Sequence, residues 1–202
     1  DNLNFLGTDG RICELKNYEE VFMMWYNVRK DMYAERIDRQ IIIKQLQLYY
    51  LQLVIRFGDV REQIGLTKSD IPVEQSDKIL ADNQFPKINK SIIMNADFLP
   101  TKVIQYEALQ NPETISYDYL YGLTGYEFHE KESRSRRNKA ANLEKELAEL
   151  MKPSPYFKGA NVWLSELDEL EKVIDRARAE GWGYDLPKQK FTDRIRADRR
   201  TS

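Results

Sequence analysis

The feature that most constrains the fold is a run of forty residues, 18–57, that contains neither glycine nor proline. Such a run lacks the two residues that most often interrupt a helix. At about 1.5 Å per residue, a helix over this range would be about 60 Å long. Asn17 is the expected N-cap, and Glu19 and Glu20 would lie in the first turn, where the helix dipole favours carboxylates. The run therefore predicts one long helix.

The apolar residues of this run follow a heptad pattern. Positions spaced alternately four and three residues apart are apolar in eight of ten cases, and Glu35 and Arg39 interrupt them. The ten positions are Val21, Trp25, Val28, Met32, Glu35, Arg39, Ile42, Leu46, Tyr49 and Leu53. This pattern is typical of a coiled coil. Residues 41–55 are so apolar that we expect more than one face of the helix to be covered there.

A second long segment without glycine or proline, 126–152, is the expected partner. Near its end four apolar residues share one face: Ala140, Leu143, Leu147 and Leu150. In an antiparallel arrangement its apolar end would meet residues 21–32. Its polar middle, around Arg134, would meet the polar break at 35–40, and the aromatic segment before it would meet 41–57. That break would be a flexible point or ordinary solvated coil with charges that set the register.

The predicted fold is mainly α: a long antiparallel coiled coil with a small helical globular head, a short N-terminal β-hairpin and a returning base helix. The hairpin spans 3–15 around a turn at 7–10, and the base helix spans 161–180. The expected domains are a hairpin at 1–17, coiled-coil arms at 18–41 and 129–153, a head at 42–128, and a base helix with a basic tail at 154–202.

Composition excludes several classes of function. The single cysteine, Cys13, rules out an internal disulfide framework, favours an intracellular setting, and is expected to be a buried small hydrophobe. A net charge of −2 gives no overall field that would attract nucleic acid or anionic lipid. No apolar stretch is long enough to span a membrane. His129, the one histidine, lies among charged residues and is interpreted as a solvated side chain rather than a catalytic base.

Catalytic motifs are also missing from the sequence. It lacks the ligand spacing of a zinc site and the glycine-rich phosphate loop of a nucleotide-binding site. We therefore expect no catalytic residue, no metal site and no cofactor site in this chain. The chain begins without methionine, and we expect it to be a piece of a longer protein.

Three short patches carry a resemblance to a known family. They are Trp25-Tyr26-Asn27-Val28-Arg29 with Tyr33 and Arg36, then Tyr117-Asp118-Tyr119-Leu120-Tyr121-Gly122-Leu123, then Trp163-Leu164-Ser165-Glu166-Leu167. In this order and at these separations the chain resembles the C-terminal portion of the breakage-reunion core of type IIA DNA topoisomerases, in the form found in eukaryotes and large DNA viruses. The sequence departs from the family pattern at 128–132, and residues 58–116 match no motif.

The resemblance implies that the chain is the exit gate, or C-gate, and the coiled coil of a dimeric enzyme. That enzyme cuts one duplex, passes another through the gap and reseals it with ATP. Its catalytic tyrosine, magnesium site and ATPase would lie N-terminal to this region, so ATP and magnesium belong to the parent enzyme. The expected location is the nucleus or the site of DNA replication, which is the host cytoplasm for a viral member.

Two sets of candidate site residues follow from this resemblance. A homodimer interface in the head would use Tyr117, Leu120, Tyr121, Leu123 and Tyr126, although some of these residues would instead pack on 41–57. A surface that contacts duplex DNA weakly and without sequence preference would use Lys131, Arg134, Arg136, Arg137 and Lys139. The alternative for the second set is a solvated helix face. The basic tail after Pro187 would be a solvated terminus or a further DNA contact.

One alternative comes from another class of protein: a free-standing coiled-coil scaffold that binds a protein partner. It would keep the arms and the head without a topoisomerase parent, and sequence preceding this chain would distinguish the two. A small helical enzyme would need a pocket with convergent polar groups, for which the sequence provides no pattern.

Overall fold

The computed structural model describes residues 3–7, 10–66 and 71–180, and the fold is mainly α, as expected. The chain divides into two units, residues 1–160 and 161–202, which are described separately. In the described residues no helix has both the length and the apolar character that a membrane crossing requires. The basic tail at 187–202 lies outside the described residues.

The expected N-terminal hairpin is confirmed. Strands β1 (Leu3–Leu6) and β2 (Ile12–Leu15) pair antiparallel, with Leu3 opposite Leu15 and Leu6 opposite Ile12. Two of the four turn residues, 8 and 9, lie outside the described residues. Cys13 is half-buried rather than buried, because a two-stranded hairpin has no second layer to cover its faces.

Helix α1 (Tyr18–Val60) confirms the long helix and continues three residues beyond its predicted end. Its 43 residues give a length of about 65 Å. The Asn17 side chain accepts a hydrogen bond from the Glu20 amide at 2.9 Å, and the Glu20 carboxylate accepts one from the Lys16 amide at 2.8 Å. This reciprocal pair satisfies two backbone donors at the helix start, so the predicted N-cap is confirmed.

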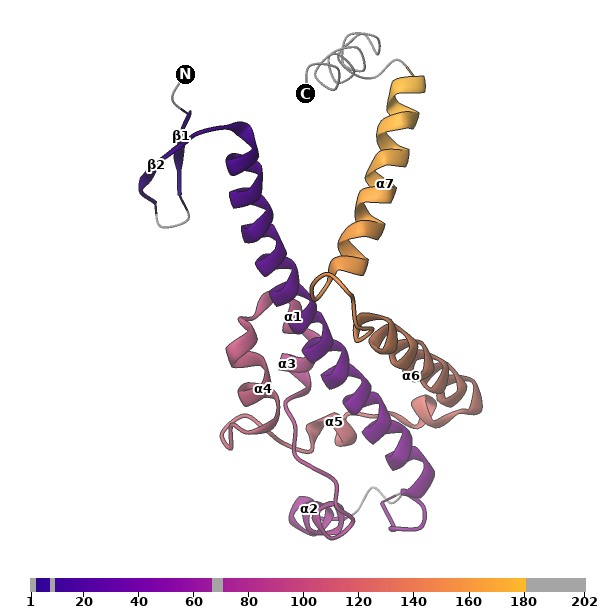
Figure 1. The fold of residues 1–202 in the computed structure, drawn as a ribbon. Coiled ribbons are helices and arrows are strands. Elements are labelled where there is room, and N and C mark those ends of the chain that lie inside the picture. Colours follow the sequence, from indigo (N-terminus) through magenta and orange to yellow (C-terminus); the bar gives the residue numbers. More distant parts are fainter. Residues whose placement is uncertain (1–2, 8–9, 67–70, 181–202) are drawn as a thin grey trace. The chain divides into compact units, whose positions relative to one another are not determined.

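The head consists of short helices packed on the C-terminal segment of α1, residues 43–60 (Figure 1). Its elements are α2 (Val73–Asp82), α3 (Lys90–Met94), η1 (Ala96–Phe98), α4 (Thr101–Leu109), α5 (Asp118–Tyr121) and η2 (Gly125–Phe128). An isolated antiparallel bridge joins Ile88 to Ser116. Leu80, Ile93 and Ile104 are fully buried against α1, so a single apolar core holds the short helices together.

Polar side chains tie the head's loops to this core. Tyr117 and Tyr119 donate hydrogen bonds from their hydroxyls to the carbonyls of Phe85 and Pro86, each at 2.9 Å. Arg39 of α1 donates to the carbonyls of Ala96 and Asp97 at 3.1 and 2.7 Å. Backbone acceptors in the loop after α2 and in η1 therefore receive side-chain donors.

Helix α6 (Glu130–Leu150) returns antiparallel to α1. Two ion pairs fix its direction, since Asp59 near the end of α1 pairs with Arg137, whereas Lys44 pairs with Glu146. The four expected apolar residues form the packed face: Ala140 and Leu147 are buried, and Leu143 and Leu150 are half-buried. The antiparallel pair and the predicted apolar face of the second helix are confirmed.

The register predicted for this pair is wrong. Residues 143–151 were expected to meet 21–32 of the first helix, but Glu146 pairs with Lys44. The cause is that the aromatic segment does not continue the helix: Tyr117, Tyr119 and Leu120 pack in the head core, and α6, which begins at Glu130, lies beside the C-terminal segment of α1. The polar break at 35–40 meets other parts of the chain instead: Arg39 contacts the head, and Asp38 pairs with Lys158. The domain boundaries stay a prediction.

The connector after α6 contacts the middle of α1 closely. Ile37 is fully buried, and a Cβ atom at Gly159 would lie 2.9 Å from its Cγ1 atom and 3.3 Å from the Tyr33 carbonyl oxygen. Gly159 also has φ +90°, which favours glycine. The second unit contains most of α7 (Ala160–Ala179), which confirms the predicted third helix to within one residue. Leu167, Leu170 and Ile174 on its predicted apolar face are exposed.

Candidate dimerisation surface and nucleic-acid interface

Two of the five predicted interface residues are buried within their own chain. Tyr117 and Leu120 belong to the head core, and the Tyr117 hydroxyl donates to the Phe85 carbonyl. Burial raises the pKa of Tyr117. Both side chains therefore offer little surface to a partner, which agrees with the alternative that some of the five pack within the chain. The interface itself stays a prediction.

The other three predicted residues keep surface available. Tyr121 is exposed, and its hydroxyl donates to Asp77 Oδ1 at 2.5 Å, while Asp77 also pairs with Lys87 at 3.3 Å. Desolvation, followed by this hydrogen bond, raises the pKa of Tyr121 and keeps its hydroxyl protonated as a donor. Leu123 is half-buried, and Tyr126 is 63% exposed with its ring 5.6 Å from His129.

The head carries a second group of exposed apolar side chains, which no sequence pattern predicts. Phe98 in η1 is 86% exposed, and Met94 at the end of α3 is 47% exposed. Both lie in the range 58–116, for which no motif was found. Helices of three and five residues are too short to show an amphipathic period, so no pattern in the sequence indicates which of their apolar residues face outward.

A groove of about 530 Å³ lies near this group, between α1 and α6. Its apolar residues come from α1, α3, the segment before η2, and α6: Tyr50, Leu51, Val54, Met94, Leu123 and Leu143. Its polar residues are Gln47, Glu127, Arg136, Lys139, Asn142 and Glu146. The groove therefore combines an apolar lining with charged groups, and it includes Leu123 from the predicted interface.

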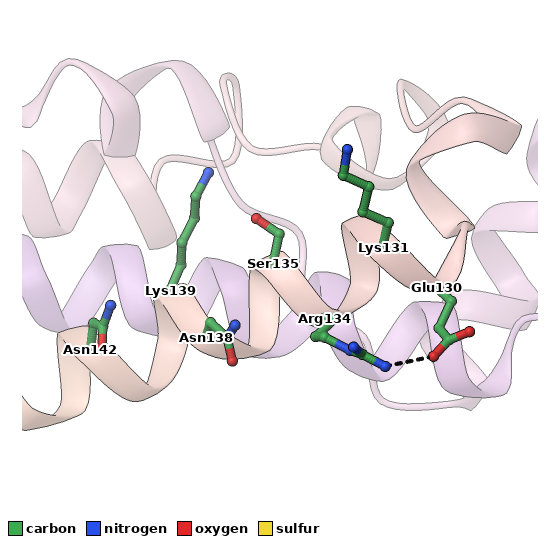
Figure 2. A pocket seen from close by; sticks show the side chains of 7 residues that line it. All are labelled: Glu130, Lys131, Arg134, Ser135, Asn138, Lys139 and Asn142. Carbon is green, nitrogen blue, oxygen red and sulfur yellow. Dashed lines mark hydrogen bonds and ion pairs between the residues drawn. The ribbon is translucent and has the colours of Figure 1, made fainter.

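Three of the five predicted DNA-facing residues lie together on the outer face of α6, which we call the α6 cation face. Figure 2 shows Lys131, Arg134 and Lys139 there with three polar neighbours, Ser135, Asn138 and Asn142. The only acid lining this surface is Glu130, whose Oε1 accepts from Arg134 at 2.8 Å. No described acid pairs with Lys131 or Lys139. The face offers cations and neutral donors, which is the side-chain chemistry that contacts phosphate oxygens.

The structure separates the other two predicted cations from this face. Arg136 is half-buried and lies 3.7 Å from a Glu127 carboxylate oxygen, next to the groove. Arg137 pairs with Asp59 of α1 at 2.6 Å. Each of these two cations therefore has an acidic partner within the chain, and the DNA surface stays a prediction. Helical spacing places 136 and 137 away from the line through 131, 135 and 139.

Among residues 3–7, 10–66 and 71–180, no cluster of three or more histidine, cysteine, aspartate or glutamate residues could hold a metal ion. His129 is exposed, as predicted, and precedes the first turn of α6.

Known proteins similar to this chain are DNA topoisomerases 2. No protein-family model matches the chain. The chain is 28% identical over 186 residues to the DNA topoisomerase 2 of African swine fever virus isolate Tick/Malawi/Lil 20-1/1983, and 29% identical over 187 residues to that of isolate Pig/Kenya/KEN-50/1950. These alignments cover 91% of this chain but only 15% of each viral protein.

A solved structure has a similar fold. It is the DNA-binding, cleavage and re-ligation domain of Plasmodium falciparum topoisomerase II, with a TM-score of 0.64 and 14% sequence identity over 89% of this chain and 24% of that one. The shared fold and the alignment along nearly the whole chain agree with the three sequence patches. The chain is therefore homologous to the viral DNA topoisomerases 2, and it fits the C-terminal part of the type IIA breakage-reunion core.

Proposed function

We propose that this chain forms the exit gate, or C-gate, and the coiled-coil arm of an ATP-dependent type II DNA topoisomerase. In this proposal two copies dimerise through their heads, hold the transported duplex, and then release it. The observation that carries the proposal is an antiparallel helix pair bearing a head, in a segment homologous to DNA topoisomerases 2. An antiparallel pair suits a gate because it joins the head to the rest of the enzyme through two helices rather than one.

The α6 cation face would contact the duplex through its phosphates. Contacts to phosphates carry no base information, so binding through them would be weak and independent of sequence. A weak contact suits a duplex that must leave.

ATP and magnesium would act in parts of the parent enzyme outside this chain. Its place of action would be the nucleus or, for a viral enzyme, the site of DNA replication in the host cytoplasm.

Sedimentation of the chain over a series of concentrations tests the dimer. We expect a reversible dimer that Tyr126→Asp weakens, because Tyr126 is exposed in the head. Val173→Asp on α7 is the matched control, since Val173 has a similar exposure outside the head. A chain that stays monomeric at every concentration contradicts the gate and would favour the scaffold alternative.

Fluorescence anisotropy with a short labelled duplex tests the α6 cation face. We expect the triple variant Lys131→Ala, Arg134→Ala, Lys139→Ala to weaken binding equally for different sequences. The slope of log affinity against log salt should fall by about 2 to 3 for three lost phosphate contacts. The control removes three exposed lysines elsewhere: Lys78, Lys102 and Lys145. Equal losses in both triple variants would mean that the α6 cation face has no special role.

A further inference from the structure

The head carries both a protruding ring and a groove that would receive one. Phe98 is 86% exposed, more than any other large apolar side chain in the described residues. The groove of about 530 Å³ between α1 and α6 is lined by Leu51, Leu123 and Leu143 among others. An exposed phenylalanine and an apolar groove are uncommon together on a monomer's surface, because contact of apolar side chains with water is unfavourable.

The ring and the groove are connected through a short stretch of chain. Met94 lines the groove, and Phe98 follows it by four residues across the junction of α3 and η1. A two-fold dimer uses the same patch on both subunits, so residue i contacts j and j contacts i. A protrusion adjacent to a matching groove satisfies this condition, because a single two-fold axis between them places each ring in the other subunit's groove.

The charges beside the ring and on the groove are complementary. Asp97 precedes Phe98 and is exposed, and no described cation pairs with its carboxylate. Lys139, at the edge of the α6 cation face, also lies on the wall of the groove, and no described acid pairs with it. A phenylalanine that enters the partner's groove would carry its neighbouring carboxylate toward this ammonium group. Complementary charges beside an apolar centre are typical of a specific interface.

We infer that Phe98 of each copy inserts into the α1–α6 groove of a second copy of this chain, with Asp97 facing Lys139. This inference rests on the proposed function and names the surface through which the heads meet. It commits to a second copy as occupant because the groove, the ring and the two charges lie on one chain. Leu123, already a predicted interface residue, lies within the groove, so the two surfaces are continuous.

Sedimentation of full-chain variants tests the inference. Phe98→Asp should raise the dimer dissociation constant by about 100-fold, since a buried aromatic residue at an interface centre is replaced by a charge. Its circular dichroism should not change, and its melting temperature should match that of the wild type at concentrations where both are monomeric, because the side chain touches little of its own chain. Tyr106→Asp is the matched control, as Tyr106 is 50% exposed on α4 and does not line the groove; its dimer should be much less affected.

Charge reversal provides a second readout. Asp97→Lys should weaken the dimer, and adding Lys139→Asp in the same chain should restore much of the affinity. Cross-linking gives a third: in a Cys13→Ser background, a Phe98→Cys protein mixed with a Leu143→Cys protein should form an interchain disulfide. A Phe98→Cys protein mixed with a Tyr106→Cys protein should not.

The outcomes separate the inference from the proposed function. A wild-type dimer that Phe98→Asp disrupts, together with the expected cross-link, supports both. A wild-type dimer that Phe98→Asp leaves intact overturns the inference, while the proposed exit gate stands on another surface of the head. A wild-type chain that is monomeric throughout overturns the dimeric gate itself.

Discussion

The two ends of helix α1 share one sequence pattern but differ in burial. In the N-terminal segment, residues 18–32, the heptad positions Trp25 and Met32 are 48% and 53% exposed. In the C-terminal segment Leu46 and Leu53 are each 5% exposed, because the head and α6 cover different faces of the helix. The heptad pattern therefore identifies an apolar stripe, but it does not say which parts of that stripe are covered within the chain.

The exposed segment is helical for local reasons. It has no glycine or proline, it begins with the paired Asn17 and Glu20 hydrogen bonds, and it continues a helix already formed by the packed segment. Extending an existing helix costs far less than nucleating one. Helix α1 therefore extends beyond the core that stabilises it.

Alanine substitutions at heptad positions of the two segments should differ most in their effect on the free energy of unfolding. Leu53→Ala should lower the free energy of unfolding by about 2 to 5 kcal/mol, because it removes buried methyl groups and leaves a cavity. Met32→Ala should change it by about 0.5 kcal/mol or less, as expected for an exposed side chain. Urea unfolding followed by circular dichroism measures both. Similar losses would show that the N-terminal segment is covered in solution, for instance by another copy.

A substitution where the connector meets the middle of α1 should lower the free energy of unfolding by an intermediate amount. Gly159→Ala should cost about 2 to 3 kcal/mol, because the new methyl group would meet Ile37 at 2.9 Å and the residue would keep φ +90°. Gly65→Ala is the matched control, since Gly65 has φ +77° but no atom within 4 Å of the added Cβ.

The difference between these two variants isolates the steric part of the cost, which should be about 1 kcal/mol or more. Thermal or urea unfolding of both proteins measures it. If Gly65→Ala costs as much as Gly159→Ala, backbone conformation alone accounts for the effect, and the close contact of the connector with Ile37 contributes nothing.

Features that depend on local sequence could be predicted. The glycine-free runs gave α1 and α6, Asn17 gave the N-cap, and the apolar spacing from Ala140 to Leu150 gave the packed face of α6. The mainly α class rests on the same runs, and each of these features needs only neighbours within a few turns of the chain. The resemblance to type IIA topoisomerases rests instead on three short patches and on their order along the chain.

The register of the helix pair could not be predicted, because apolar zones match one another at several shifts. At the polar break, Arg39 donates to the carbonyls of Ala96 and Asp97. Every residue has a backbone carbonyl, so the sequence does not show which ones accept such a bond. Burial of individual residues was equally out of reach. Tyr117 and Tyr126 belong to one aromatic segment, yet the first is in the core and the second is 63% exposed.

The smallest expected effect concerns the ion pairs that reveal the register. Arg137 and Asp59 join α6 to α1 at 2.6 Å, but their side chains are 56% and 53% exposed. Water screens such a pair, and ordering two side chains offsets much of the attraction, so the coupling free energy should be about 0.2 to 1 kcal/mol. A double-mutant cycle with Arg137→Ala and Asp59→Ala measures it, and it should fall further at high salt.

The pair within α6 is a useful control for this cycle. Arg134 and Glu130 lie on the α6 cation face at 2.8 Å and are more exposed, so their coupling should be no larger. Both values would then be small beside the loss from Leu53→Ala, because apolar burial rather than charge would hold α6 on the C-terminal segment. A salt-resistant coupling above about 2 kcal/mol for Arg137 and Asp59 would reverse that order. It would mean that charge pairing does more to select the register than the apolar face of Ala140 and Leu147.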